Sequence, residues 1–192
     1  MDRKESNIII PQSIISVPRK RLHVLHADIR HIRNGKVIWE DLGRDNLLHD
    51  QGEQAILSAY FATAMSGYGA TPANLYLGLD ARATPAEADT LSSLSGEPSG
   101  NGYARSALAT GGTGLSGQDF YINQPAAYYR ADSKVVTFTA SGGNWTAVTQ
   151  LFLCTVSSGT AGKIIATVAL SASRTLLDGD SMQVSMYIGL SE

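Results

Sequence analysis

Apolar residues between positions 50 and 67 recur every three or four residues, which is the spacing of a helix with one apolar face. They are Ile56, Leu57, Tyr60, Phe61 and Met65. Asp50 and Glu53 have the spacing of a capping box at the start, and Gly67 closes the pattern. This spacing predicts an amphipathic helix near residues 51–66 that packs against a sheet.

A second, short helix is predicted after Thr84. Thr84 is a good capping residue, Pro85 suits the first helical position, and Glu87 can reach back to the cap. We expect this helix to end near Leu91 to Leu94.

A β-hairpin is predicted from Arg21 to Leu42, because short β-rich segments flank Asn34-Gly35, the pair that favours a type I′ turn. A two-residue turn fixes the register of the cross-strand pairs, which are Arg33–Lys36, Ile32–Val37 and Arg30–Trp39. The last pair would place a guanidinium beside an indole ring.

After Gly96 the chain consists of segments rich in β-branched and aromatic residues, each bounded by Gly, Ser, Asn or Asp. They are Tyr103–Ala109, Asp119–Asn123, Lys134–Ala140, Ala147–Thr155, Lys163–Leu170 and Ser181–Leu190. With Leu75–Leu79 and the hairpin they make eight or nine strands and no βαβ alternation. We therefore predict a mainly β fold, an antiparallel, jelly-roll-like β-sandwich with the amphipathic helix and the short helix.

The first 20 residues have a different pattern, with short isoleucine clusters interrupted by Pro11 and Pro18. The prolines forbid a continuous helix and favour extended backbone. We predict an extended N-terminal arm over residues 1–20 and a single sandwich domain over 21–192. The arm's candidate partner-binding residues are Ile8, Ile9, Ile10, Ile14, Ile15, Arg19, Lys20 and Arg21.

Charge is scarce and unevenly distributed in this chain of 192 residues. Asp, Glu, Lys and Arg make up 17% of the chain, against about 25% in typical soluble domains. Nine of the 15 Lys and Arg residues lie in the first 53 positions, and the net charge is −2. This balance argues against binding nucleic acid or a charged membrane surface, and favours a packing subunit with a basic arm. The triplet Arg19-Lys20-Arg21 is expected to face an acidic protein partner or solvent.

The absence of targeting signals and the single cysteine exclude further classes of protein. The first residues lack the apolar stretch of a secretory signal, and no apolar run approaches the length of a membrane span. We therefore expect synthesis in the cytoplasm. Cys154 is the only cysteine, which excludes an intramolecular disulfide framework.

The residues that could carry chemistry are the histidines, Cys154 and the residues of two loops. The histidines are His23, His26, His31 and His49. Those on the hairpin fall on opposite strand faces, so their positions favour ordinary strand histidines over a metal site.

Cys154 lies in an apolar strand and is expected to be a buried thiol. The glycines of residues 111–117 suggest a surface loop, and Asp178-Gly179-Asp180 a tight turn rather than a calcium site. We expect no catalytic residue, metal or cofactor.

Several separated stretches, covering about residues 45–190, carry a resemblance to a known class of proteins. They are Asn74–Leu79, Thr84-Pro85, Asp89–Leu91, Glu97–Arg105, Trp145–Val148, Ile164–Ala166 and Ser173–Asp180. In this order they resemble small virion structural proteins of tailed bacteriophages, of the tail, minor structural or head-decoration type. Glu97–Arg105 is the most specific stretch. The residues expected to specify the fold through loops are Gly100, Gly102, Arg105, Asp178, Gly179 and Asp180.

The resemblance implies a non-enzymatic structural component of the virion, made in the host cytoplasm. We expect a capsid decoration protein that docks through its arm, packs against neighbouring subunits and forms a homo-oligomer, with major capsid or tail proteins as partners. One alternative is a tail, neck or baseplate subunit. Another is a receptor- or glycan-binding module, with exposed aromatic contacts at Tyr68, Tyr121, Tyr128, Tyr129 and Trp145.

Overall fold

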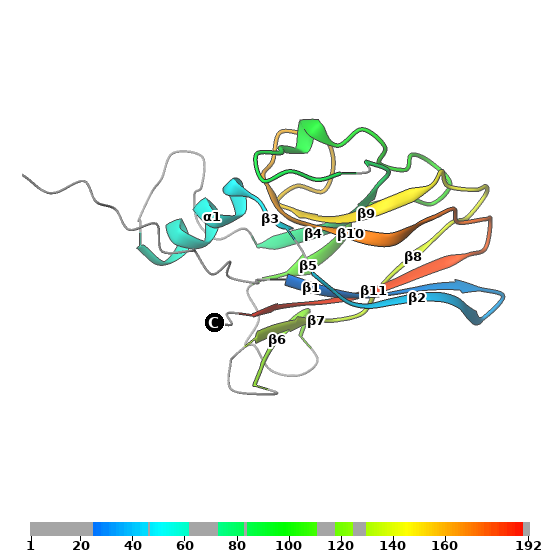
Figure 1. The fold of residues 1–192 in the computed structure, drawn as a ribbon, viewed down its shortest axis with the longest axis horizontal. Coiled ribbons are helices and arrows are strands. Elements are labelled where there is room, and N and C mark those ends of the chain that lie inside the picture. Colours follow the sequence, from blue (N-terminus) through cyan, green and yellow to red (C-terminus); the bar gives the residue numbers. More distant parts are fainter. Residues whose placement is uncertain are drawn as a thin grey trace, which may run out of the picture.

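The computed structural model describes residues 25–45, 47–61, 73–82, 84–110, 118–124 and 130–189. Two antiparallel sheets face each other in it (Figure 1). The first sheet has the strand order β2 (Lys36–Asp45), β1 (Leu25–Arg33), β11 (Ser181–Gly189), β7 (Arg130–Ser133) and β6 (Phe120–Asn123), and β8 (Val136–Thr139) also pairs with β11. The second has the order β3 (Leu47–Leu48), β10 (Ile164–Arg174), β9 (Val148–Cys154), β4 (Asn74–Asp80) and β5 (Ser106–Ala109). The predicted β-sandwich is confirmed.

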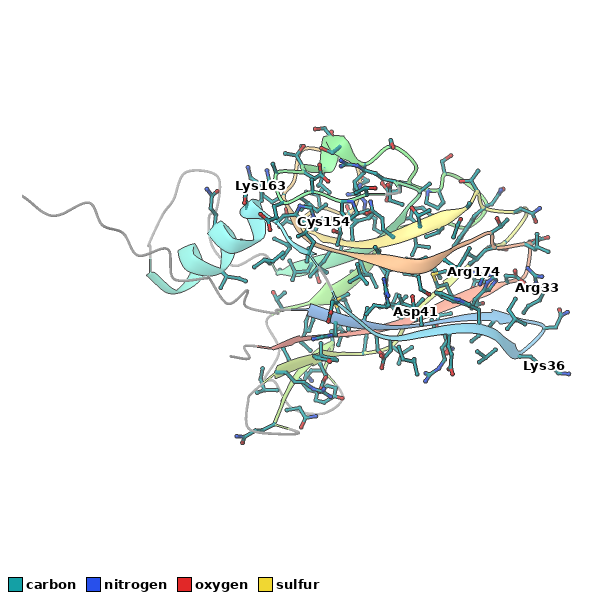
Figure 2. The ribbon with its side chains drawn as sticks, in the orientation of Figure 1. Arg33, Lys36, Asp41, Cys154, Lys163 and Arg174 are labelled. Atoms are coloured by element: carbon teal, nitrogen blue, oxygen red, sulfur yellow. The ribbon has the colours of Figure 1, made fainter. Side chains whose placement is uncertain are left out.

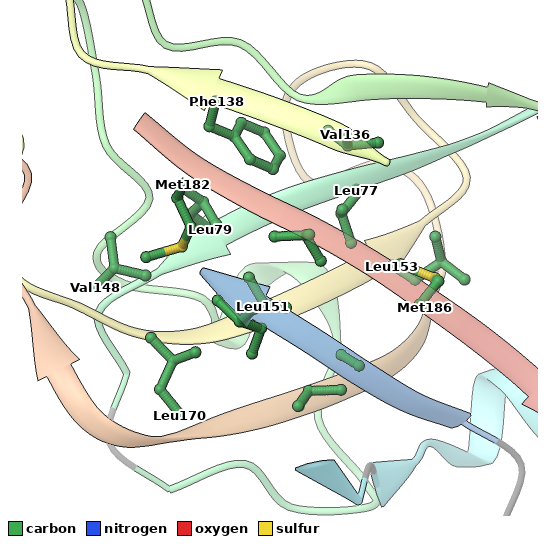
Figure 3. Packing of buried hydrophobic residues seen from close by; sticks show 14 of the residues in the cluster. Leu77, Leu79, Val136, Phe138, Val148, Leu151, Leu153, Leu170, Met182 and Met186 are labelled. Carbon is green, nitrogen blue, oxygen red and sulfur yellow. The ribbon is translucent and has the colours of Figure 1, made fainter. Parts of the chain in front are cut away.

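The main core lies between the two sheets (Figure 3). On β11 every second side chain is buried, as expected for a strand with one face toward the core, and these are Met182, Val184 and Met186. The opposing sheet contributes Leu77, Leu79, Leu151 and Leu153, each at most 1% exposed. This apolar interior fixes the positions of the loops at the ends of the strands.

A smaller second core lies on the other face of β9, under the connection from β4 to β5. Leu91 from the connection packs with Phe152, Cys154 and Ile164, and all four are buried. Gly78 is required beside this core, because a Cβ atom there would collide with the Phe152 ring. The 81–105 connection therefore acts as a third layer on the second sheet.

The short helix predicted after Thr84 is not an α-helix. The Asp89 carboxylate accepts the Ala86 N–H at 2.7 Å, and the Asp89 N–H donates to the Ala86 carbonyl at 3.0 Å. A side chain that takes a backbone N–H in this way competes with helix formation. The result is a turn, followed by one 3-10 turn, η1 (Leu91–Ser93).

The amphipathic helix is present as α1 (Asp50–Phe61) and packs against β10 beside the sandwich (Figure 1). The contact is close, because a Cβ atom on Gly52 would collide with the Ile165 carbonyl. Gln51 fixes the start of the helix by accepting the Ile164 N–H at 3.0 Å. The predicted end at Gly67 lies outside the described residues.

The hairpin forms around Asn34 and Gly35, both with positive φ (49° and 72°), as a type I′ turn requires. The Arg33–Lys36 and Ile32–Val37 pairs are confirmed. The Arg30–Trp39 pair is wrong, because a bulge inserts Ile38 and pairs Trp39 with His31 instead. The guanidinium over the Trp39 ring belongs to Arg174, 5.0 Å from the ring centroid.

Several predictions fall outside the described residues. They are the arm over 1–20 with its partner-binding residues, the position of His23, and the loop at 111–117. Within the described part of the chain, no helix is both long and apolar enough to cross a membrane.

Candidate functional site

Asp180 is the most densely bonded side chain at the hairpin end of the sandwich. It is 2% exposed, and its carboxylate lies 2.9 Å from His31 Nε2. Arg33 donates to it from Nε at 2.9 Å and from Nη2 at 2.7 Å, and the Leu177 N–H donates at 2.9 Å. One carboxylate therefore joins the end of β1 to the turn before β11.

These donors stabilise the charged form of Asp180. The Arg33 hydrogen bonds, with those from Leu177 and His31, hold the pKa of the carboxyl well below its usual range despite burial. Gly179 completes the turn with a φ of 85°, and its N–H donates to the Ala140 carbonyl at 2.8 Å. Asp178 accepts the Gly142 N–H at 2.8 Å. The two aspartates hold a tight turn, with Asp180 occupied by protein donors.

Three loops meet at the same end and bond to one another. Asn101, which has a φ of 48° and lies between Gly100 (69°) and Gly102 (79°), presents its carbonyl to Trp145 Nε1 at 2.9 Å. Its side-chain amide donates to the Asn144 carbonyl at 3.0 Å. Asn144 in turn accepts the Asp178 N–H at 2.8 Å. The loops at 99–103, 141–145 and 176–180 therefore form one surface with a fixed backbone.

Arg105 organises a second buried polar cluster, beside the smaller core. It forms a bidentate pair with Glu97, with both N···O distances at 2.7 Å. It also donates to the carbonyls of Val156 at 3.1 Å and Gly159 at 3.0 Å. Arg105 thus fixes the 97–105 stretch to the loop after β9.

Tyr103 extends this cluster toward the main core. Its hydroxyl donates to Glu97 Oε1 at 2.9 Å and accepts the Leu79 N–H at 2.9 Å. Burial, with the Glu97 carboxylate nearby, raises the pKa of the Tyr103 phenol. This phenol stays neutral and acts as a structural bridge.

Cys154 is a buried thiol in the structure, as its sequence context suggests. Its Sγ donates to the Val156 carbonyl at 3.2 Å, and Arg105 Nη1 lies 3.6 Å away. Burial raises the pKa of the thiol even though the Arg105 charge acts in the opposite direction. A thiol held neutral is a poor nucleophile.

The described histidines occupy separate positions. His26 stacks on Tyr187, with ring centroids 4.7 Å apart, and lies 3.0 Å from Asp45. His49 is buried between the Glu87 carbonyl and the Thr167 hydroxyl, and burial lowers its pKa. Among the described residues, no three His, Cys, Asp or Glu side chains are grouped as metal ligands would be.

The aromatic residues proposed as receptor contacts are only partly placed. Trp145 was expected to be exposed, but it is 2% exposed and stacks edge-on against Tyr103, with centroids 5.4 Å apart. The apolar ring fills the core, so this expectation is wrong. Tyr121 is half-buried, and Tyr68, Tyr128 and Tyr129 lie outside the described residues.

Sequence reasoning did not identify the partners of these clusters. His31 alternates with Ala27 and Ile29 on β1, so its burial follows from the period of two along a strand. Its contact with Asp180 spans 149 positions, and no local pattern encodes it. Glu97 and Arg105 are the two ends of the stretch that resembles phage structural proteins, but their pairing depends on how the 81–105 connection folds over β9.

Comparison with known families gives one result over most of the chain. The family model described as podophage GP4 fiber I protein gp80 matches residues 48–188. This region contains both polar clusters except for the two β1 partners of Asp180. No curated protein and no solved structure shows significant similarity to the chain. The chain therefore belongs to the family of the podophage GP4 fiber I protein gp80, and it is a non-enzymatic structural component of a phage virion that associates with other virion proteins.

Proposed function

We propose that the chain is a tail-fibre subunit that attaches to the virion through its N-terminal segment. The observation that carries this proposal is the family match over residues 48–188, whose description is that of a fibre protein. It favours the tail alternative over capsid decoration, the position first expected from the sequence.

The two polar clusters support a structural role. The buried charged groups Asp180 and Arg105 are bonded within the chain and join loops to strands. Buried charges of this kind are costly to leave unpaired, and they hold one arrangement of the loops. A subunit that transmits force or position along a fibre benefits from such rigidity.

The charge distribution supports attachment through the N-terminal segment. The family match begins at residue 48, and five of the nine Lys and Arg residues that precede it lie in the first 21 positions, namely Arg3, Lys4, Arg19, Lys20 and Arg21. A basic segment outside the matched body suits an acidic surface on another virion protein. The candidate contacts remain Ile8, Ile9, Ile10, Ile14 and Ile15 with the basic Arg19, Lys20 and Arg21.

Deletion of residues 1–18 tests the attachment. We expect the shortened chain to fold, judged by circular dichroism, and to be missing from purified virions. A chain in which a Gly/Ser segment of equal length replaces residues 1–18 controls for length and should be missing as well. Incorporation of either variant at the level of the full chain would contradict attachment through this segment.

A further inference from the structure

The chain contains two Asn-Gly pairs, Asn34-Gly35 in the hairpin and Asn101-Gly102 in the loop at 99–103. Asparagine loses its side-chain amide most readily before glycine, because glycine has no Cβ to hinder attack by its backbone nitrogen on the preceding side chain. The reaction needs no enzyme and converts the amide to an acid. The two pairs are therefore the positions in the chain with the greatest local tendency to deamidate.

The φ angles do not distinguish the two pairs. They are 49° at Asn34 and 48° at Asn101, and the glycines that follow have φ angles of 72° and 79°. All four residues are exposed to solvent. The contacts of each asparagine are therefore what separates the two positions.

Asn101 is held by three neighbours. Its Nδ2 donates to the Asn144 carbonyl at 3.0 Å, and its backbone carbonyl accepts the Trp145 Nε1–H at 2.9 Å. Gly143 lies against the side chain, since a Cβ atom added there would come within 2.8 Å of Asn101 Nδ2. To reach the nitrogen of the next residue, the side-chain carbon of Asn101 would have to leave these contacts.

Asn34, by contrast, lies at the exposed tip of the hairpin. Figure 2 shows Arg33 and Lys36, which flank the Asn-Gly pair, at the outer end of the two strands. The Asn34 side chain forms no hydrogen bond with any residue that the structure describes. A Cβ atom on Gly35 would meet nothing within 4 Å, so the space around the turn is open. The Asn34 side chain is therefore free to turn toward the Gly35 nitrogen.

We propose that Asn34 is a site of spontaneous deamidation and that Asn101 is protected by its contacts. The Gly35 nitrogen, after losing its proton to hydroxide, attacks Asn34 Cγ. The Cγ–Nδ2 bond then breaks, and the amide leaves as ammonia with a proton from water. The product is a five-membered succinimide. Water opens this ring at either carbonyl and leaves aspartate or isoaspartate at position 34, with no change in oxidation state.

The modification changes the hairpin end in two ways. Each copy gains one negative charge beside Arg33, whose guanidinium is already bonded to Asp180. Isoaspartate also adds one carbon to the backbone, so it does not keep the two-residue type I′ turn that fixes the Arg33–Lys36 pair. We therefore expect chains that have aged in solution to carry an altered hairpin tip on a folded sandwich. This expectation does not depend on where the chain lies in the virion.

Peptide mapping of the aged full-length chain tests the proposal. The chain is incubated in mildly alkaline buffer, digested with pepsin in acid, where the reaction is slow, and analysed by mass spectrometry. We expect position 34 to be converted at least about tenfold faster than position 101, because Asn101 must first lose a hydrogen bond.

The chain unfolded in guanidinium chloride is the matched control. Both asparagines then have the same following residue and no tertiary contacts, so positions 34 and 101 should be converted at similar rates. Asn34→Gly is a second control, because Gly-Gly also favours a type I′ turn. This variant should keep its fold, judged by circular dichroism, and lose most of the ammonia that the folded chain releases.

Two outcomes would overturn the proposal. One is a folded chain in which the two positions are converted at the same relative rates as in the unfolded chain, or in which Asn101 is faster. The other is an Asn34 that stays intact in the folded chain for the time that converts half of it in the unfolded chain, because the turn itself would then be protective. Neither outcome bears on the place of the chain in the tail fibre.

Discussion

At the residue scale, Arg105 shows how one side chain can hold several segments. Its side chain is 3% exposed, and its guanidinium bonds to a carboxylate and to two backbone carbonyls from a separate loop. The planar fork of arginine fits this set of acceptors, whereas the single ammonium of lysine does not. The cluster therefore depends on geometry as well as on charge.

Arg105→Lys should lower the free energy of unfolding by about 2 kcal/mol, because the bidentate pair is lost and buried acceptors are left without donors. Urea denaturation measures this change. Arg30→Lys is the matched control, since Arg30 also faces a glutamate but the pair is exposed on both sides. If Arg105→Lys and Arg30→Lys lowered the free energy of unfolding equally, burial would not be the reason for the effect at Arg105.

Asp180 makes the free energy of unfolding depend on pH in the acid range. Its pKa is lower in the folded chain than the value of about 3.9 expected in the unfolded chain. The stabilisation is therefore fully present above about pH 4 and is lost as pH falls through the folded-state pKa. Denaturation midpoints should fall steeply from pH 4 to pH 2.5, and less steeply in Asp180→Asn.

Two results would count against this account of Asp180. One is that the wild type and Asp180→Asn lose the same amount of stability as the pH falls from 4 to 2.5. The other is an Asp180→Asn chain as stable as the wild type at pH 7, where the aspartate charge is expected to stabilise the fold through Arg33 and His31.

At the scale of elements, the contact between β4 and β9 requires a glycine at position 78. Gly78 faces the Phe152 ring, and its partner residue across the strands is Phe152 itself. The ring also contacts the guanidinium of Arg105, 5.0 Å from its centroid. The strand pair, the smaller core and the Arg105 cluster are thus joined at this point.

Gly78→Ala should cost about 2 kcal/mol of stability, because the methyl group collides with the Phe152 ring. Phe152→Leu in the same chain should recover part of that loss, since the shorter side chain leaves room for the methyl group. A double-mutant cycle by urea denaturation measures the coupling. Additive effects of the two changes would contradict the collision.

Elements with local signals could be predicted from the sequence. The Asn34-Gly35 turn and α1 depend on neighbouring residues, and most of the strands have visible β-rich patterns. The bulge at Ile38 did not follow, because it is a register shift between β1 and β2 that the Asn-Gly turn does not encode. The turn at Ala86 was missed although it is local, because the capping pattern of Thr84 to Glu87 predicts a helix and the Asp89 carboxylate accepts the Ala86 N–H instead. Strand β7 was missed because Arg130–Ser133 is polar and is held by pairing with β11 and β6.

The candidate site was predictable only in part for the same reason. Arg105 and Asp180 were singled out from the resemblance, but their partners come from distant positions in the chain. Glu97 is near Arg105 in sequence, whereas Val156, Gly159, His31 and Arg33 are brought close only by the sandwich. Trp145 was misjudged because its core position depends on the loop at 99–103.

At the scale of the whole molecule, several of the few charged residues serve internal contacts rather than the surface. Outside the hairpin, the few charged side chains include Arg105, Asp132 and Asp180, which are buried. Three exposed apolar side chains, Val37, Ile38 and Leu42, lie on β2 at the edge of the first sheet. The body of the chain is thus fixed by internal ion pairs.

The central claim is that the chain is part of the tail fibre, and its position on intact virions tests this most directly. A small epitope tag at the exposed Asn34-Gly35 turn, labelled with gold-conjugated antibody, would show the position by electron microscopy. We expect gold on the fibres of the tail. Gold spread over the capsid shell would contradict the account and support capsid decoration instead.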